Sequence, residues 1–231
     1  MIEETDFETF LYISKNKYQI FVYDKNNLKN LYKKELKINE EIDLNSLSKF
    51  LDENIYKIEK VVSNFIKNII LIIDDDKILN INIAIKKKNY ENHINQKYLE
   101  NNLTEVKDIF KENYQDQIIM HMIIINNNVN ENNFLSNNED INDDYLYLEV
   151  NFISISNSLT FIFDKLLESH QIKIRQYMSG SYIKSFFDEN DVELSVIANK
   201  LRNGLNKNEV TLVSKLIENK GFFEKFFQLF S

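Results

Sequence analysis

Few residues in this chain combine the types and the spacing that catalysis or metal binding requires. The three histidines, His93, His121 and His170, are far apart, and the absence of cysteine excludes thiolate catalysis, disulfides and cysteine-based zinc sites. Asp74-Asp75-Asp76 follows an apolar run, and three carboxylates at such a position are more typical of a solvated turn than of a cation site. Ser179-Gly180-Ser181 lacks the flanking residues of a nucleophile elbow or a phosphate loop. We therefore predict a protein that is not an enzyme and has no cofactor and no metal.

Charge and composition narrow the possible partners and compartment. The net charge is -8 and the sequence pI is about 5.1, and Lys86-Lys87-Lys88 is the only triple basic run, so nucleic acid is not expected as a partner. The start, Met1 to Glu8, is acidic and polar rather than a secretory signal, and no apolar stretch approaches the ~20 residues of a membrane-spanning helix. A cytoplasmic protein is predicted.

Alternating and continuous apolar runs predict a sheet in the first third of the chain. The helix there has apolar residues at helical spacing, with Asp43 or Asn45 as its cap. The predicted elements are a hairpin of strands at Phe10–Ile13 and Gln19–Tyr23, a third strand at Tyr32–Ile38, a helix at 44–65 and a buried strand at Ile69–Ile73.

A second set of elements follows in the order strand, helix, strand, strand. These are a strand at Ile78–Ile85, a helix at Gln96–Phe110 and strands at Ile118–Ile125 and Tyr145–Ile155, with an exposed acidic, asparagine-rich loop at Asn126–Asp144. A helix at Leu159–Leu167, a strand at Lys173–Met178 and a helix through Phe187 come next. The charge pattern of residues 188–218 is that of a linker, although a short helix at Val192–Leu201 is possible within it.

The last residues of the chain form an amphipathic pattern. On a helix, six apolar side chains fall within one arc of roughly 160° and polar residues take the other side. A short helix of this kind can lie in the headgroup region of a bilayer, whereas the alternative is a final core helix. The predicted membrane-binding residues are Phe222, Phe223, Phe226, Phe227, Leu229 and Phe230.

Several local stretches, in the same order along the chain, resemble the cell-division protein FtsA, an actin-like ATPase. The stretch from Ile42 to Leu47 resembles the start of the helix that precedes a first-domain strand of that family, and Ile94 to Asn101 resembles the start of the helix in its subdomain 1C. Gln117 to Ile123 and Tyr147 to Ile153 resemble two further strands, and the Phe-rich end resembles the family's membrane-targeting sequence.

The resemblance implies an α+β (α/β) chain: half of an actin-like (ribonuclease H-like) fold with an inserted SHS2 (strand-helix-strand-strand) module and a C-terminal amphipathic helix. It assigns residues 8–76 and 156–187 to subdomain 1A, 77–155 to the SHS2-like subdomain 1C, 188–218 to a linker and 219–231 to the membrane-targeting helix. The family's phosphate-binding loop is replaced here by Tyr12-Ile13-Ser14-Lys15, and its second domain is not matched, so no nucleotide binding is expected.

The resulting hypothesis is a non-enzymatic, membrane-tethered adaptor of the bacterial cell-division machinery that acts through protein contacts of the SHS2-like module. The expected partners are the inner-membrane lipid surface and division proteins, with FtsZ and FtsA-like self-association as candidates. The expected location is the cytoplasm, peripherally on the inner face of the membrane at the division site. Two alternatives stay open: a PilM-like cytoplasmic platform for a pilus or secretion system, and a degenerate remnant that still binds a nucleotide.

Overall fold

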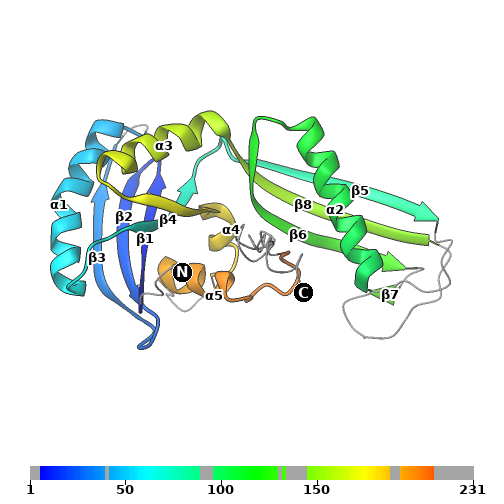
Figure 1. The fold of residues 1–231 in the computed structure, drawn as a ribbon, viewed down its shortest axis with the longest axis horizontal. Helices are drawn as coiled ribbons and strands as arrows, with labels where there is room; N and C mark the ends of the chain where they lie inside the picture. Colours follow the sequence, from blue (N-terminus) through cyan, green and yellow to red (C-terminus); the bar gives the residue numbers. More distant parts are fainter. Residues whose placement is uncertain are drawn as a thin grey trace, which may run out of the picture.

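Two β-sheets lie next to each other along the long axis of the molecule (Figure 1). The structure is a computed structural model, and it describes residues 6–39, 42–88, 96–129, 132–133, 145–187 and 193–210. All structural statements below concern these residues. Within them, no helix is both long and apolar enough to cross a membrane.

The first sheet has five strands in the order β3-β2-β1-β4-β9. Its strands β1, β2 and β3 form an antiparallel meander, and β1, β4 and β9 run parallel to one another. The central strands are continuous apolar runs because both of their faces are buried. Their bounds are β1 Phe7–Ser14, β2 Lys17–Asp24, β3 Lys29–Lys37, β4 Asn68–Asp74 and β9 Lys173–Ser179.

Two helices flank this sheet, α1 (Leu44–Val62) and α3 (Asn157–Ser169). Asp43 caps α1 by accepting hydrogen bonds from the backbone N–H groups of Asn45 and Ser46, both at 3.0 Å. The helix ends three residues before the predicted Phe65, because Ser63 adopts a left-handed conformation with φ 51° and its N–H bonds back to the carbonyl of Glu59.

The second sheet is antiparallel, and its strands have the order β5-β8-β6-β7. The chain enters it after β4 and leaves it into α3, so the whole sheet is an insertion within the first. Helix α2 (Gln96–Asn113) covers one face, where Val106 and Phe110 pack with Phe152 in a separate core. The bounds are β5 Leu79–Lys88, β6 Gln117–Val129, β7 Asn132–Asn133 and β8 Tyr145–Ser156.

Strand β6 is longer than predicted. The predicted loop begins at Asn126, but β6 continues to Val129, which pairs with Leu146 of β8. Asparagine has a low intrinsic β propensity, and here the pairing with β8 outweighs that propensity. The rest of the predicted loop, apart from β7, lies outside the described residues.

The linker prediction for residues 188–218 is wrong over 194–210. Helix α5 (Leu194–Arg202) packs its apolar face into the core of the first sheet, where Leu194, Ile197, Ala198 and Leu201 are buried. The charged residues that suggested a tether are bound to the sheet: Glu193 accepts a hydrogen bond from Lys33 at 2.7 Å, and Arg202 pairs with Glu8 at 2.5 Å. Positions 188–192 and 211–218 lie outside the described residues.

The architecture is therefore mixed α/β, and the order β3-β2-β1-β4-β9 is consistent with half of an actin-like fold. The inserted sheet has the predicted element order β5, α2, β6, β8, with the short β7 added between its last two strands. Its identification with the SHS2 module stays a prediction, as does the terminal amphipathic helix at 219–231, which lies outside the described residues.

Candidate functional site

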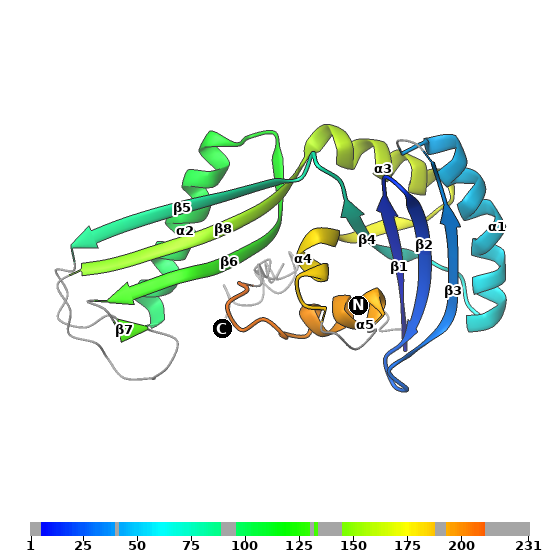
Figure 2. The ribbon, with the colours of Figure 1, turned by 180° about the vertical axis from the view of Figure 1, so that it is seen from behind.

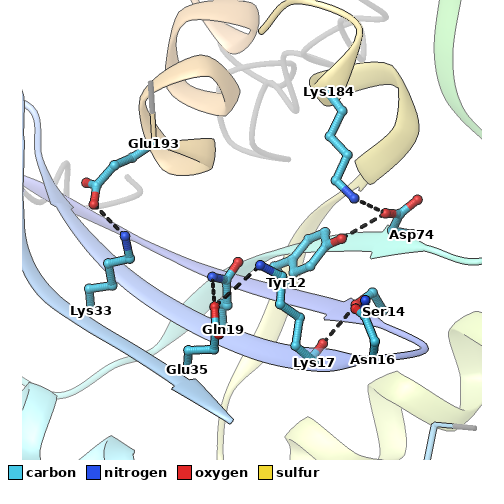
Figure 3. A network of polar contacts seen from close by, with 10 residues as sticks. All are labelled: Tyr12, Ser14, Asn16, Lys17, Gln19, Lys33, Glu35, Asp74, Lys184 and Glu193. Carbon is cyan, nitrogen blue, oxygen red and sulfur yellow. Dashed lines mark hydrogen bonds and ion pairs between the residues drawn. The ribbon is translucent and has the colours of Figure 1, made fainter. Parts of the chain in front are cut away.

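The ends of β1, β4 and β9 are where a ligand is expected, because open α/β sheets bind ligands beyond the carboxyl ends of their parallel strands. Side chains of the chain itself fill this place (Figure 3). The Tyr12 side chain comes from β1, is 1% exposed, and donates a hydrogen bond to the Asp74 Oδ2 atom at 2.8 Å. Lys184 from α4 (Gly180–Lys184) also pairs with Asp74, and its Nζ atom lies 5.3 Å from the centre of the Tyr12 ring.

The electrostatics of this cluster keep Lys184 charged and Tyr12 protonated. Burial raises the pKa of the Tyr12 hydroxyl, and the neighbouring Asp74 raises it further, although the hydrogen bond with Lys184 acts in the opposite direction. Burial lowers the pKa of Lys184, but the hydrogen bonds with Asp74 and Tyr12 outweigh this effect, so that pKa lies above its ordinary value. Neither group is suited to give or take a proton near neutral pH.

Gly180 brings the start of α4 against the end of β4. A Cβ atom at this position would lie 2.6 Å from the Cβ of Asp74 and 3.1 Å from the Tyr12 ring. Contacts under 3 Å do not occur between carbon atoms in folded proteins, so no room for even one methyl group remains between Gly180 and Asp74. The tight approach of α4, together with Tyr12, fills the crevice.

The three consecutive aspartates each have a separate role at this edge of the sheet. Asp74 holds Tyr12 and Lys184, Asp75 accepts a hydrogen bond from the Lys77 N–H at 2.8 Å, and Asp76 pairs with Lys15. These contacts fit the expected turn. Among the described residues, no three His, Cys, Asp or Glu side chains are grouped so that they could hold a metal ion.

A buried polar cluster joins the two sheets around His121 of β6, whose residue is 2% exposed. Its Nε2 atom accepts a hydrogen bond from the backbone N–H of Ser179 at 3.0 Å, and Nδ1 lies 2.7 Å from a carboxylate oxygen of Glu209. Tyr182 donates to the other oxygen of Glu209 at 2.9 Å, and its ring lies 4.4 Å from that of His121. The neutral ring therefore carries its proton on Nδ1.

This cluster places β6, the end of β9 and the segment after α5 in contact. Both ring nitrogens of His121 are occupied by hydrogen bonds, so the side chain is a packed structural histidine. Sequence reasoning missed Glu209, which is 88 positions away and falls in the predicted linker. His170 lies 3.4 Å from both Ser48 and Asp52, and His93 lies outside the described residues.

A groove of about 540 Å³ lies between the two sheets, next to the His121 cluster. One wall is β6, with Ile118, Met120 and Met122, and the facing wall is β9, with Tyr177 and Met178. The end of α5 and the segment that follows it complete the lining. Both β6 and β9 are edge strands over this stretch, so the groove runs between two sheet edges.

The predicted membrane-binding residues are not part of either arrangement. Phe222, Phe223, Phe226, Phe227, Leu229 and Phe230 all lie outside the described residues, and their role stays a prediction.

Comparisons with known proteins find 28 similar chains among solved structures, including the following three. No protein-family model matches the chain, and no curated protein matches it. The cytoplasmic domain of EpsL, an inner membrane component of the type II secretion system of Vibrio cholerae, is 6% identical with a TM-score of 0.39, over 80% of this chain and 60% of that one. A PilM–PilN type IV pilus biogenesis complex is 7% identical with a TM-score of 0.49, over 76% and 48%.

The third is a protein of unknown function with an actin-like ATPase fold from Bacteroides thetaiotaomicron, 16% identical with a TM-score of 0.30, over 80% of this chain and 58% of that one. The chain thus spans from 48% to 60% of the length of these three structures. All three TM-scores are below 0.5.

Proposed function

We propose that this protein is a non-enzymatic scaffold that holds partner proteins at the inner face of a membrane. The observation that carries the proposal is the filled crevice at the ends of β1, β4 and β9. Tyr12, Asp74 and Lys184 occupy the place where a ligand is expected, and Gly180 closes it with backbone. Because the chain's own side chains occupy the place of a small ligand, we infer that the fold serves to bind proteins.

The inserted sheet offers the partner surface. Helix α2 covers one of its faces, and Figure 2 shows the strands β5, β8 and β6 in front of that helix, from the opposite side. On this open face β5 presents exposed Asn80 and Asn82, and β8 presents Tyr145, Tyr147 and Glu149 farther along the sheet, where Tyr145 lies opposite Lys88. Tyrosine is enriched in protein interfaces because its rigid ring contributes contact area at a small entropic cost.

Several side chains on this face are already held in place. Asn82 donates to Glu149 at 3.2 Å and accepts from Asn151 at 2.6 Å, and the ammonium of Lys86 lies 5.1 Å from the centre of the Tyr145 ring. Side chains that are ordered before binding lose less conformational entropy when a partner docks. These contacts favour the open face as the surface for a protein partner.

Attachment to the membrane is assigned to the amphipathic stripe from Phe222 to Phe230. Its support is the sequence pattern, in which the apolar residues occupy one side of a helix. A weak anchor suffices for a scaffold, because several copies in one assembly bind the membrane together and raise each other's effective concentration.

Two assemblies fit such a scaffold. We place a platform of a pilus or secretion system first, because the similar solved structures include the cytoplasmic domain of EpsL and a PilM–PilN complex. An adaptor of the division machinery is the second candidate, and its specific support is the Phe-rich stripe, which PilM-like proteins are not expected to have. FtsZ and self-association belong to this second candidate only.

Fluorescence localisation tests the proposal in the cells that make the protein. The full chain carries an N-terminal tag and is imaged beside a truncation that ends at Asn219. We expect the full chain at the cell periphery and the truncation in the cytosol. Peripheral foci away from midcell support the pilus or secretion platform, and a midcell band supports the division adaptor. A diffuse signal for both chains contradicts the membrane scaffold.

A further inference from the structure

The groove between β6 and β9 has an edge strand on each side. Edge strands present backbone N–H and C=O groups that are not used within their own sheet, and proteins cover such edges or pair them. Ile118 at the β6 edge is 39% exposed, and it lies among apolar lining residues that include Met120 and Met178. The lining also includes polar residues, among them Arg175, Gln176 and Arg202, so the groove offers both apolar and hydrogen-bonding contacts. A mixed groove between two strand edges suits an extended peptide.

The chain already begins to pair with β6 at the mouth of this groove. Ile123 and Glu209 form an antiparallel bridge. The N–H of Ile124 bonds to the carbonyl of Asn208 at 2.9 Å, and the N–H of Val210 bonds to the carbonyl of Met122 at 2.8 Å. Val210 is also the last described residue, and it lines the groove.

The direction of this pairing points toward the groove. Because the bridge is antiparallel, a strand that continued from Val210 in the same pairing would run along β6 toward its beginning, past His121 and on to Ile118. The next residues, Val210-Thr211-Leu212-Val213-Ser214, include three β-branched residues and a leucine, a composition typical of a strand. They are joined directly to a bonded residue, so their effective concentration at the groove is high.

We propose that residues 211–215 occupy the groove as an added strand paired with the edge of β6. The occupant is this chain's own segment, and it connects the edge of the inserted sheet to the edge of the first sheet. The inference goes beyond the proposed function and does not depend on it. The docked strand would also limit the distance between the groove and the amphipathic stripe, because only residues 216–221 would then separate the strand from Phe222.

Engineered disulfides test this placement in the full chain, which contains no native cysteine. If the antiparallel pairing with β6 continues residue by residue, Ser214 lies opposite Ile118. The bulge in β6 between Ile119 and His121 can shift this register by one residue. Val213 is therefore tested as well. The test variants combine Ile118→Cys with Ser214→Cys or with Val213→Cys. The matched control combines Leu79→Cys with the same tail cysteines, since Leu79 is 37% exposed and lies at the opposite edge of the sheet, on β5.

We expect an intrachain disulfide with Ile118→Cys at a yield at least roughly tenfold above that with Leu79→Cys, because a disulfide forms only when the two Cα atoms lie within about 7 Å. Equal yields at both edges, or no cross-link at either, overturn the proposal. Cross-links between two molecules instead of within one also overturn it, since they identify a second copy as the occupant. Denaturant unfolding of the reduced variants shows that the substitutions leave the fold intact.

Hydrogen exchange provides a second readout that needs no cysteine. Leu212→Glu replaces an apolar side chain of the docked strand with a charged one, and we expect the backbone amides between Ile118 and Met122 that face the groove to exchange roughly tenfold faster than in the unchanged protein. Asn219→Glu adds the same charge beyond the docked residues and should leave these amides unchanged. Unchanged exchange in Leu212→Glu contradicts the docked strand.

Discussion

Gly180→Ala should destabilise the protein by about 2–3 kcal/mol, because overpacking at a tight contact costs this much and the neighbours here have little room to move. The added Cβ would meet the Cβ of Asp74 at 2.6 Å and its Cα at 3.2 Å, so the backbone of β4 or of α4 must shift. The shift also disturbs the hydrogen bond from Tyr12 to Asp74. Thermal unfolding measures the effect, with a fall in Tm of roughly 5–10 °C.

Gly204→Ala is the matched control for this substitution. Gly204 has φ 86° and no atom within 4 Å of an added Cβ, so the alanine is strained but meets no neighbour. We expect a loss of about 1 kcal/mol from the left-handed conformation alone. If Gly180→Ala is as stable as the unchanged protein, or less destabilised than Gly204→Ala, then α4 does not fit closely against β4 and the crevice is not filled in the way described.

Phe226→Glu with Phe227→Glu should weaken binding to lipid vesicles by about 10²–10⁴-fold and leave the folded part unchanged. Moving one Phe side chain out of water contributes about 1.5–3 kcal/mol, so losing two costs about 3–6 kcal/mol, at about 1.4 kcal/mol for each factor of ten. Sedimentation with phosphatidylcholine vesicles measures binding, and these neutral lipids minimise attraction or repulsion by the added charges.

Lys225→Glu is the control, because it changes the net charge by the same amount on the polar side of the stripe. It should bind vesicles as the unchanged chain does. Unfolding of the double variant would identify Phe226 and Phe227 as core residues, and equal release by Lys225→Glu would show that charge rather than apolar area governs attachment. Either result removes the amphipathic anchor from the account.

Periodicity was sufficient to predict most of the elements. The buried run Ile69–Ile73 is the centre of β4, and the apolar residues at helical spacing after Asp43 form α1 with that aspartate as its cap. Both features are local, since a strand with two buried faces and a capped amphipathic helix each leave a pattern within a few residues. Element ends were less accurate, because Ser63 ends α1 and pairing with Leu146 extends β6.

The polar clusters could not be predicted, since they join residues that are distant in the chain. Glu209 reaches His121 across 88 positions, and Lys184 reaches Asp74 across 110. Nothing in the local sequence distinguishes these charged residues from solvated ones. Helix α5 agrees with the possible short helix at Val192–Leu201, but its packing against the sheet was not predicted for a related reason: the partners of its flanking charges, such as Glu8 for Arg202, lie at the other end of the chain.

Stability in the presence of Mg²⁺ and ATP tests the central claim, that the crevice is filled by the protein's own side chains and the chain acts as a scaffold. The Tm of the unchanged full chain is measured with and without the nucleotide. A ligand at 100 times its Kd adds about 2.7 kcal/mol, which would raise Tm by roughly 5–10 °C for a chain of this size. We expect no shift, because Tyr12 and the Lys184–Asp74 pair occupy the site. A concentration-dependent rise that disappears in Lys184→Ala would contradict it and identify a nucleotide-binding protein.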